Sequence, residues 1–403
     1  SNHETSIFDL QENFFQIHLC EFHRIPSKIN NYNEMKIGFD AKRAFLNASG
    51  LGNYSRNTLN ALKKYYPQNN YTLFTPKVNA DLFTNYDQFR IVSPPGFYKG
   101  FLKSVWRSLF ITWKLKKHDI DIFHGLSNEL PSGIHKTGIP AVVTIHDLIF
   151  MRYPEFYKPV DRKIYFRKMK YACKAADKII AISQQTRNDV ETFFQIPPEK
   201  VEVIYQPVAA TFFEKQDETN VFKEYHLPEK YILAVGTLES RKNQLTLLEA
   251  LHQLKAEIPL LLVGKPTSYH SDLKKYIVEK EMENQVFFLS GLPEKELAAL
   301  YQNALFSVYI SVFEGFGLPV IESMASGCPV LTSSVSCLPE TAGDAAVLCN
   351  PGDVTDVAEK LKSLLEDESF RKQIVQKGAD RANAFHPETY VEKLISLYTS
   401  LLN

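Results

Sequence analysis

The sequence predicts an α/β protein with two domains, each built around its own parallel β-sheet. Three observations lead to this fold class. The chain has 403 residues, more than one hydrophobic core usually organises, so two domains of comparable size are expected. Short apolar runs alternate with longer amphipathic stretches, which is typical of βαβ units. The alternation starts afresh after a polar interruption near residue 208, which indicates a second sheet of the same kind.

The first series of predicted strands begins at Met35. Its strands are the apolar runs MKIGFDA, YTLFT, RIVS, IDIFHG, AVVTIHD, KIIAIS and VEVIY. Residues 1–34 differ from this pattern because they contain no glycine and no succession of strand, turn and helix signals. We therefore treat 1–34 as an N-terminal appendage without an assigned role, and 35–208 as the first domain.

The second series begins at YILAVGT, residues 231–237, and covers a second domain over 209–386. Its further strands are PLLLVG, QVFFLSG, LFSVYIS, PVLTSS and AAVLCN. The stretch QPVAATFFEKQDETN between the two series loses the alternation and turns polar, as an interdomain connection does. A final helix over 387–403 carries an apolar stripe at helical spacing, and we expect it to pack back on the first domain.

Charge and cysteine usage narrow the function classes. Lys+Arg and Asp+Glu both number 46, so no long-range field singles out nucleic acid or an acidic partner. The five cysteines are scattered and form no Cys-x-x-Cys pair and no Cys/His cluster with zinc spacing. No apolar run approaches the roughly 20 residues of a membrane span, and no signal-peptide core follows the N-terminus. The expectation is a cytoplasmic protein that does not bind nucleic acid.

Two stretches of the first domain carry site candidates, because ligands of open parallel sheets bind beyond the carboxyl ends of the strands. In ASGLGNYSRNTLNAL, Gly50 and Gly52 would bring backbone N–H groups close to a phosphate or sugar at a helix start. In TIHDL, His146 and Asp147 end a strand as a titratable pair. The structural alternatives are a tight glycine turn, and a buried, hydrogen-bonded histidine beside a capping aspartate.

A cationic pair follows the first strand of the second series. Arg241 and Lys242 lie in GTLESRKNQLTLLEAL, where a loop leads into a helix. Cations there oppose the positive end of the helix dipole, and a bound anion would remove the conflict. A solvated surface pair is the alternative, because the conflict costs little at an exposed position.

The stretch EGFGLPVIES places Glu314 and Glu322 around a glycine-rich turn. Gly315 and Gly317 interrupt any helix after Glu314, and Pro319 suits the first helical position. We therefore predict Glu314 on the loop and Glu322 in the first helical turn. An acidic residue in a first turn is stabilising in itself, which would explain Glu322 but neither Glu314 nor the glycines that bare the backbone.

The segment SVFEGFGLPVIESMASGCPVLTSSVSCLPETAGDAAVLCNPGD resembles the donor-site signature of the retaining glycosyltransferases of family 4, which have the GT-B fold of two Rossmann-like domains. The likeness extends from Met35 to the C-terminus, and the two glutamates separated by seven residues are part of its most specific stretch. It implies transfer of a sugar from a nucleotide diphosphate donor to a hydroxyl of a glycan or lipid-linked glycan, without a metal or another cofactor. Likeness to bacterial envelope polysaccharide enzymes suggests GDP-mannose as the donor.

The resemblance also assigns roles to individual residues. Those near the donor sugar and the reaction centre are His146, Asp147 and Glu314. Those at the donor diphosphate are Gly52, Arg241, Lys242, Phe316, Gly317 and Leu318. Those at the nucleoside are Gly291, Leu292 and Glu322. This chain departs from the family at Thr237, where many members have an arginine after the glycine, so the diphosphate clamp would rely on Arg241.

No metal is expected at the diphosphate, because Arg, Lys and helix N-terminal amides can stabilise the charge on the departing phosphate oxygens. The Asp-Ile-Asp at 119–121 looks like the metal-binding Asp-x-Asp of other glycosyltransferases, but it opens a strand, opposite to the edge where α/β sites lie. We interpret it as structural. The resemblance gives the two glutamates roles in binding and orientation rather than those of a glycosidase acid and nucleophile.

Residues 97–118 contain six Lys or Arg, no acid and two Trp. A basic amphipathic helix of this kind can lie on anionic lipid, so the segment is a candidate for peripheral contact with the inner face of the membrane. The alternative is a domain-surface helix with Trp106 and Trp113 buried.

Two other classes of function remain open. A nucleotide-sugar epimerase or a phosphorylase can use the same architecture, although a phosphorylase needs a pyridoxal phosphate lysine and a longer chain. A degenerate domain that only binds sugar nucleotides is the non-enzymatic alternative, and the presence of both glutamates, Lys242 and His146 argues against it.

Overall fold

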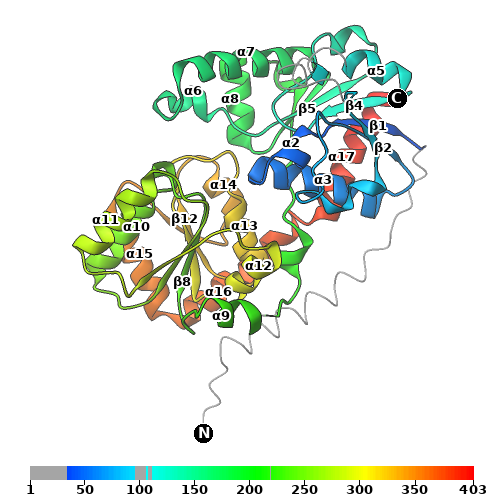
Figure 1. Ribbon diagram of the computed structural model, residues 1–403. Coiled ribbons are helices and arrows are strands. Elements are labelled where there is room, and N and C mark those ends of the chain that lie inside the picture. Colours follow the sequence, from blue (N-terminus) through cyan, green and yellow to red (C-terminus); the bar gives the residue numbers. More distant parts are fainter. Residues whose placement is uncertain (1–33, 96–105, 108–110, 218) are drawn as a thin grey trace. The chain divides into compact units, whose positions relative to one another are not determined.

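The computed structural model describes residues 34–95, 106–107, 111–217 and 219–403 (Figure 1). These residues divide into two compact units. We call residues 34–207 together with 387–403 the first domain, and residues 208–386 the second domain. Each has one parallel sheet with helices, so the predicted α/β class with two sheets is confirmed. Apart from Glu34, the N-terminal appendage lies outside the described residues.

The first domain contains a seven-stranded parallel sheet with the order β3-β2-β1-β4-β5-β6-β7. Its strands are β1 (Lys36–Asp40), β2 (Asn70–Phe74), β3 (Arg90–Val92), β4 (Ile122–Gly125), β5 (Ala141–Ile145), β6 (Lys178–Ala181) and β7 (Val201–Val203). Its α-helices are α2 (Lys42–Leu46), α3 (Gly50–Tyr65), α5 (Ile111–Lys117), α6 (Ile149–Arg152), α7 (Pro159–Ala175), α8 (Gln184–Phe194) and α17 (Pro387–Leu402). The order reverses between β1 and β4, which pair in parallel with Ile37 opposite Ile122.

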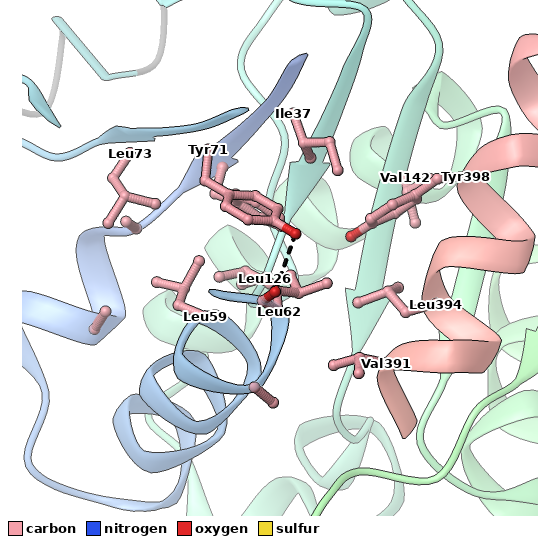
Figure 2. Packing of buried hydrophobic residues seen from close by; sticks show 14 of the residues in the cluster. Ile37, Leu59, Leu62, Tyr71, Leu73, Leu126, Val142, Val391, Leu394 and Tyr398 are labelled. Atoms are coloured by element: carbon pink, nitrogen blue, oxygen red, sulfur yellow. Dashed lines mark hydrogen bonds between the residues drawn. The ribbon is translucent and has the colours of Figure 1, made fainter. Parts of the chain in front are cut away.

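Alternate strand residues of this sheet face two hydrophobic layers, as the period of a β-strand requires. In β5, Val142 belongs to the layer that contains residues of α3 and α17, whereas Val143 belongs to the layer that contains residues of α5, α7 and α8. Figure 2 shows the first layer, in which Val391, Leu394 and Tyr398 of α17 come together with residues of the sheet and of α3. The C-terminal helix therefore packs on the first domain although the second domain precedes it in the chain.

The second domain contains a six-stranded parallel sheet with the order β10-β9-β8-β11-β12-β13. Its strands are β8 (Ile232–Val235), β9 (Leu260–Val263), β10 (Val286–Leu289), β11 (Phe306–Tyr309), β12 (Val330–Ser333) and β13 (Val347–Cys349). Its α-helices are α9 (Thr219–Glu224), α10 (Gln244–Leu254), α11 (Tyr269–Glu279), α12 (Glu294–Asn303), α13 (Leu318–Ala325), α14 (Leu338–Ala342), α15 (Val354–Glu366) and α16 (Glu368–Asn383). The inner strands β9 and β12 are buried on both faces, which suits a parallel sheet covered by helices.

Candidate functional site

The second sheet reverses its strand order between β8 and β11, and open α/β sheets bind ligands beyond the strand ends at such a point. Arg241 and Lys242 end the short 3-10 helix Ser240–Lys242 that follows β8. Glu314 lies in the loop that follows β11. The topology thus brings Lys242 and Glu314 into contact although 72 positions separate them in the chain.

One carboxylate oxygen of Glu314 contacts both cations. Its Oε1 lies 2.6 Å from Lys242 Nζ and 2.7 Å from Arg241 Nη1. Lys242 Nζ also donates to the hydroxyl of Tyr309 at 2.6 Å, and Arg241 Nη2 lies 2.6 Å from Glu239 Oε1. Sequence reasoning missed Tyr309 and Glu239, because neither stands out in a motif and only the fold places them beside the cations.

The charges of this cluster determine its protonation. Burial in itself raises the pKa of Glu314, but Lys242 and Arg241 outweigh burial and bring this pKa down to about 2. Glu314 is therefore ionised at neutral pH and has no proton to donate as a general acid. The side chains of Arg241, Lys242 and Glu314 keep between 10% and 17% of their surface accessible, so a ligand can still reach them.

The loop after Glu314 leads into the N-terminus of α13. Gly317 caps this helix with a φ of 98°, in the left-handed region that favours glycine. A Cβ at this position would lie 2.5 Å from Cδ2 of Leu338, so any larger residue would also force the Leu338 side chain to move. The backbone of Phe316 is held by Thr341, whose hydroxyl donates to the Phe316 carbonyl at 2.6 Å. Residues 316–318 thus form a rigid helix start, and such a position suits an anion.

Glu322 lies further along α13 than predicted. The helix begins at Leu318, and no acidic residue occupies its first turn. The prediction was wrong because Gly317 is the cap and the helix begins at Leu318, one residue before Pro319, so the helix dipole does not explain Glu322. Tyr301 donates its hydroxyl to Oε2 of Glu322 at 3.4 Å. Burial, with the nearby charge of Glu294, raises the pKa of Glu322 to about 8, so the carboxyl is mostly protonated at pH 7.

Gly291 and Leu292 precede α12, the helix that carries both Tyr301 and Glu294. Gly291 has a φ of 74° and no atom within 4 Å of an added Cβ, so the turn conformation rather than crowding favours glycine there. Helix α12 thus connects the three predicted nucleoside residues, because Gly291 and Leu292 lie just before it and its Tyr301 contacts Glu322. Their role in binding a nucleoside stays a prediction.

His146 follows β5 directly and is buried. Its Nε2 lies 2.9 Å from the carbonyl oxygen of Leu126, which can only accept, so Nε2 carries the hydrogen. The backbone N–H of His146 donates to Asn128 Oδ1 at 2.8 Å, and the Tyr54 ring packs edge-on against the imidazole. Burial lowers the pKa of His146 to about 4. The ring is therefore neutral, and Nδ1 is its hydrogen-bond acceptor.

Asp147 and Gly52 both have local structural contacts. Oδ1 of Asp147 accepts the backbone N–H of Ile149 at 3.1 Å, at the start of α6. A Cβ on Gly52 would lie 1.7 Å from the carbonyl oxygen of Asn47, so the close approach of α3 to the preceding turn requires glycine. The structural alternatives thus account for both residues, and their assigned roles stay predictions.

A buried ion cluster at the reversal point of the first sheet was not found from the sequence. Arg107 Nε lies 2.8 Å from Asp40 Oδ2, and Arg107 Nη1 lies 2.6 Å from Glu129 Oε2. Burial raises the pKa of Glu129, but Arg107 and Lys168 together outweigh burial and lower this pKa. Asp40 ends β1, and an acidic residue at a strand end is a feature of the sequence that could have indicated a site. Its partner lies 67 positions away in the chain, and only the fold shows that pairing.

The Asp-Ile-Asp of 119–121 has structural partners at the amino end of β4. Asp119 pairs with the ammonium of Lys36, and Asp121 Oδ2 accepts the backbone N–H of Lys36 at 2.7 Å. In the described residues, no group of three or more His, Cys, Asp or Glu could hold a metal ion. Across the same residues, no helix combines the length and apolarity needed to cross a membrane.

The basic segment 97–118 is described only at 106–107 and from residue 111 onward. Trp106 is buried with 1% of its surface exposed, as the structural alternative predicted. Trp113 instead keeps 67% of its surface exposed. The remaining residues of the segment lie outside the described part, and its membrane contact stays a prediction.

Comparisons with known proteins identify the class of this chain. A family model described as glycosyl transferases group 1 matches residues 216–381, and one described as glycosyltransferase family 4 matches residues 48–212. The chain is 31% identical over 298 residues to the O-antigen chain mannosyltransferase B of Escherichia coli, covering 72% of this chain and 77% of that protein. The chain therefore belongs to the family 4 and group 1 glycosyltransferases.

Two further comparisons are with a relative longer than this chain and with a solved structure. The serotype-specific mannosyltransferase WbdA of Escherichia coli is 29% identical over 297 residues, covering 70% of this chain but only 36% of WbdA. The crystal structure of Anabaena HepE in complex with UDP and glucose has a TM-score of 0.71 at 19% identity, covering 91% of this chain and 100% of that chain. This likeness shows the fold, which is GT-B with two Rossmann-like domains.

Proposed function

We propose that this glycosyltransferase transfers mannose from GDP-mannose to a hydroxyl of a glycan or lipid-linked glycan, with retention of configuration and without a metal. The observation that carries the proposal is the contact of Arg241 and Lys242 with Glu314 beyond the carboxyl ends of β8 and β11. The names of two relatives, both mannosyltransferases and one of the O-antigen chain, support the choice of sugar and the glycan acceptor.

Arg241 and Lys242 would hold the diphosphate. Two adjacent cations and the start of α13 at residues 316–318 can neutralise the charge that develops on the leaving group, as a divalent ion does elsewhere. In the structure both cations pair with Glu314. A diphosphate that binds here would replace part of this pairing with its own contacts to Arg241 and Lys242. The cations thus remain compensated in the absence of donor.

Glu314 would orient the donor sugar. Both cations contact Oε1, which leaves Oε2 to accept hydrogen bonds from sugar hydroxyls. Because its pKa is about 2, Glu314 stays an acceptor at working pH. Glu322 would accept a ribose hydroxyl, and Nδ1 of the neutral His146 can accept one hydroxyl of the sugar.

The proposed transfer breaks the bond between the anomeric carbon and the diphosphate oxygen, and the electron pair leaves with GDP. The acceptor hydroxyl oxygen forms the new bond on the same face, and its proton passes to the departing diphosphate. Arg241 and Lys242 stabilise that leaving group through charge-assisted hydrogen bonds. No step in this scheme requires a protein carboxyl to donate a proton or to form a glycosyl intermediate.

A ligand screen followed by product analysis tests the proposal. GDP at 100 times its Kd should stabilise the protein by about 2.7 kcal/mol in a thermal-shift series that also contains UDP, ADP and CMP. Lys242→Met should lose most of this effect, whereas the matched variant Lys362→Met, at an exposed position on α15, should keep it. Stabilisation by UDP but not GDP would contradict the donor, and an inverted anomeric signal in the NMR spectrum of the product would contradict retention.

A further inference from the structure

The first half of α7 is an exposed surface that the sequence analysis did not single out. None of residues 159–168 is buried. Eight large hydrophobic residues are exposed in the described part of the chain. Four of them lie within ten positions here: Phe156 at 41%, Val160 at 68%, Ile164 at 44% and Tyr165 at 42%. Single exposed apolar residues are ordinary, but a cluster marks an interaction surface. We call residues 156–168 the α7 surface.

The α7 surface is also cationic. Residues 158–168 contain five Lys or Arg and one acid, Asp161. One of these cations is paired, because Nζ of Lys168 lies 3.5 Å from Oε1 of Glu129. The cations without an ion pair to any described residue are Lys158, Arg162, Lys163 and Arg167. A soluble helix usually compensates its charges with nearby acids, so this excess of positive charge points to an anionic partner.

Helical spacing arranges these side chains into an apolar ridge with cations beside it. Val160 and Ile164 are four residues apart and share one face, and Lys163 and Arg167 flank them. The far half of the helix is anchored, because Met169, Ala172 and Cys173 are buried in the domain core. Figure 1 shows α7 in green beside α6 and α8. The ridge is therefore presented by a rigid helix.

A groove of about 310 Å³ opens beside this ridge. Its lining residues are Met151, Pro159, Arg162, Lys163, Phe166 and Arg167. Nε of Arg162 is buried and has no hydrogen-bond partner among the residues that the structure describes. Lys163 and Arg167, which are exposed at this groove, can reach lipid phosphate oxygens, and the apolar walls would contact a hydrocarbon chain.

We propose that the α7 surface docks this glycosyltransferase on an anionic phospholipid bilayer. Val160 and Ile164 enter the interfacial region, and Lys163 and Arg167 contact lipid phosphates. Charge complementarity commits the surface to this occupant, because an apolar ridge flanked by uncompensated cations is the pattern of helices that lie in a bilayer interface. The rings of Tyr157 and Tyr165, with centroids 6.2 Å apart, suit the headgroup level.

This surface differs from the basic segment 97–118, whose described part exposes Trp113 on α5. The α7 proposal predicts that substitutions on α7 weaken membrane binding, whereas membrane contact through segment 97–118 predicts that Trp113→Ala weakens it. The α7 proposal also holds whatever sugar the enzyme transfers, because it concerns only the location of the protein.

Vesicle flotation of the full chain tests the proposal. We expect binding to phosphatidylcholine vesicles with 30% phosphatidylglycerol at 50 mM NaCl, and weak binding without the anionic lipid or at 500 mM NaCl. Each cation near an anionic bilayer strengthens partition about fivefold, so Lys163→Gln with Arg167→Gln should weaken it about 30-fold. Val160→Ser with Ile164→Ser should weaken it about tenfold or more.

The matched control is Lys274→Gln with Lys275→Gln on α11, an exposed helix of the second domain that also exposes Val278. This variant should bind vesicles like the unchanged protein. All variants alter exposed residues, and unchanged thermal melting curves will show that they fold. The proposal is overturned if the α7 variants keep full binding, whether or not Trp113→Ala loses it, or if neutral vesicles bind as well as anionic ones.

Discussion

Replacing Glu314 by Gln should destabilise the second domain by about 3 kcal/mol at pH 7. The two cations move the pKa of this carboxyl from 4.5 to about 2, and each pH unit corresponds to about 1.4 kcal/mol. Glutamine keeps the shape but leaves Arg241 and Lys242 without their shared carboxylate. Because the folded-state pKa is depressed, this stabilisation is present above about pH 4.5 and is lost as the pH falls toward 2. The gap between the two proteins should shrink over that window.

Urea unfolding at pH 7 and pH 4 measures the effect, and Glu239→Gln is the matched control. Glu239 also pairs with Arg241, but its side chain is 37% exposed, so its loss should cost well under 1 kcal/mol. Glu314→Gln should keep or tighten nucleoside diphosphate binding, because it frees the cations, while sugar transfer is lost. A loss of stability below 1 kcal/mol, or equal losses in both variants, would refute the reasoning.

Three other outcomes are expected. Glu322→Ala should weaken GDP binding in calorimetry, and in the native protein GDP affinity should rise between pH 6.5 and 9, because ionisation of Glu322 near pH 8 turns a neutral acceptor for the ribose hydroxyl into a charged, stronger one. The raised pKa of Glu322 also means that folding stability falls as pH rises from 4.5 through about 8, and Glu322→Gln should remove this slope. If GDP affinity and folding stability of the native protein did not change over these pH ranges, both statements would be contradicted. Transfer should survive EDTA, and its complete loss with recovery on adding manganese would show that a metal is required. Gly317→Ala should cost more than about 2 kcal/mol in urea unfolding, since it adds a clash with Leu338 to the strain of a positive φ, whereas Gly291→Ala adds strain alone and should cost about 1 kcal/mol; equal costs would mean that the clash is relieved.

Local sequence pattern was sufficient for the strands and for the loop position of Glu314. The runs YILAVGT and LFSVYIS became β8 and β11 because apolar runs between breakers form buried parallel strands. The same reasoning failed by one residue at α13. A glycine in the left-handed conformation caps that helix ahead of the proline, and the Leu338 side chain lies where a Cβ on this glycine would be. Helix boundaries are decided by such contacts, which a local pattern does not contain.

By itself the sequence determined the α/β class, the two parallel sheets and the order of candidate residues along the chain, because periodicity and turn chemistry act over short distances. Only the tertiary structure decided which charges meet. Arg241 and Lys242 share one oxygen of Glu314, and Arg107 bridges Asp40 at the end of β1 and Glu129 beyond β4, because each sheet reverses its strand order and brings distant strand ends together. Burial then set the protonation of these groups, since desolvation and neighbouring charge depend on three-dimensional position and not on residue type.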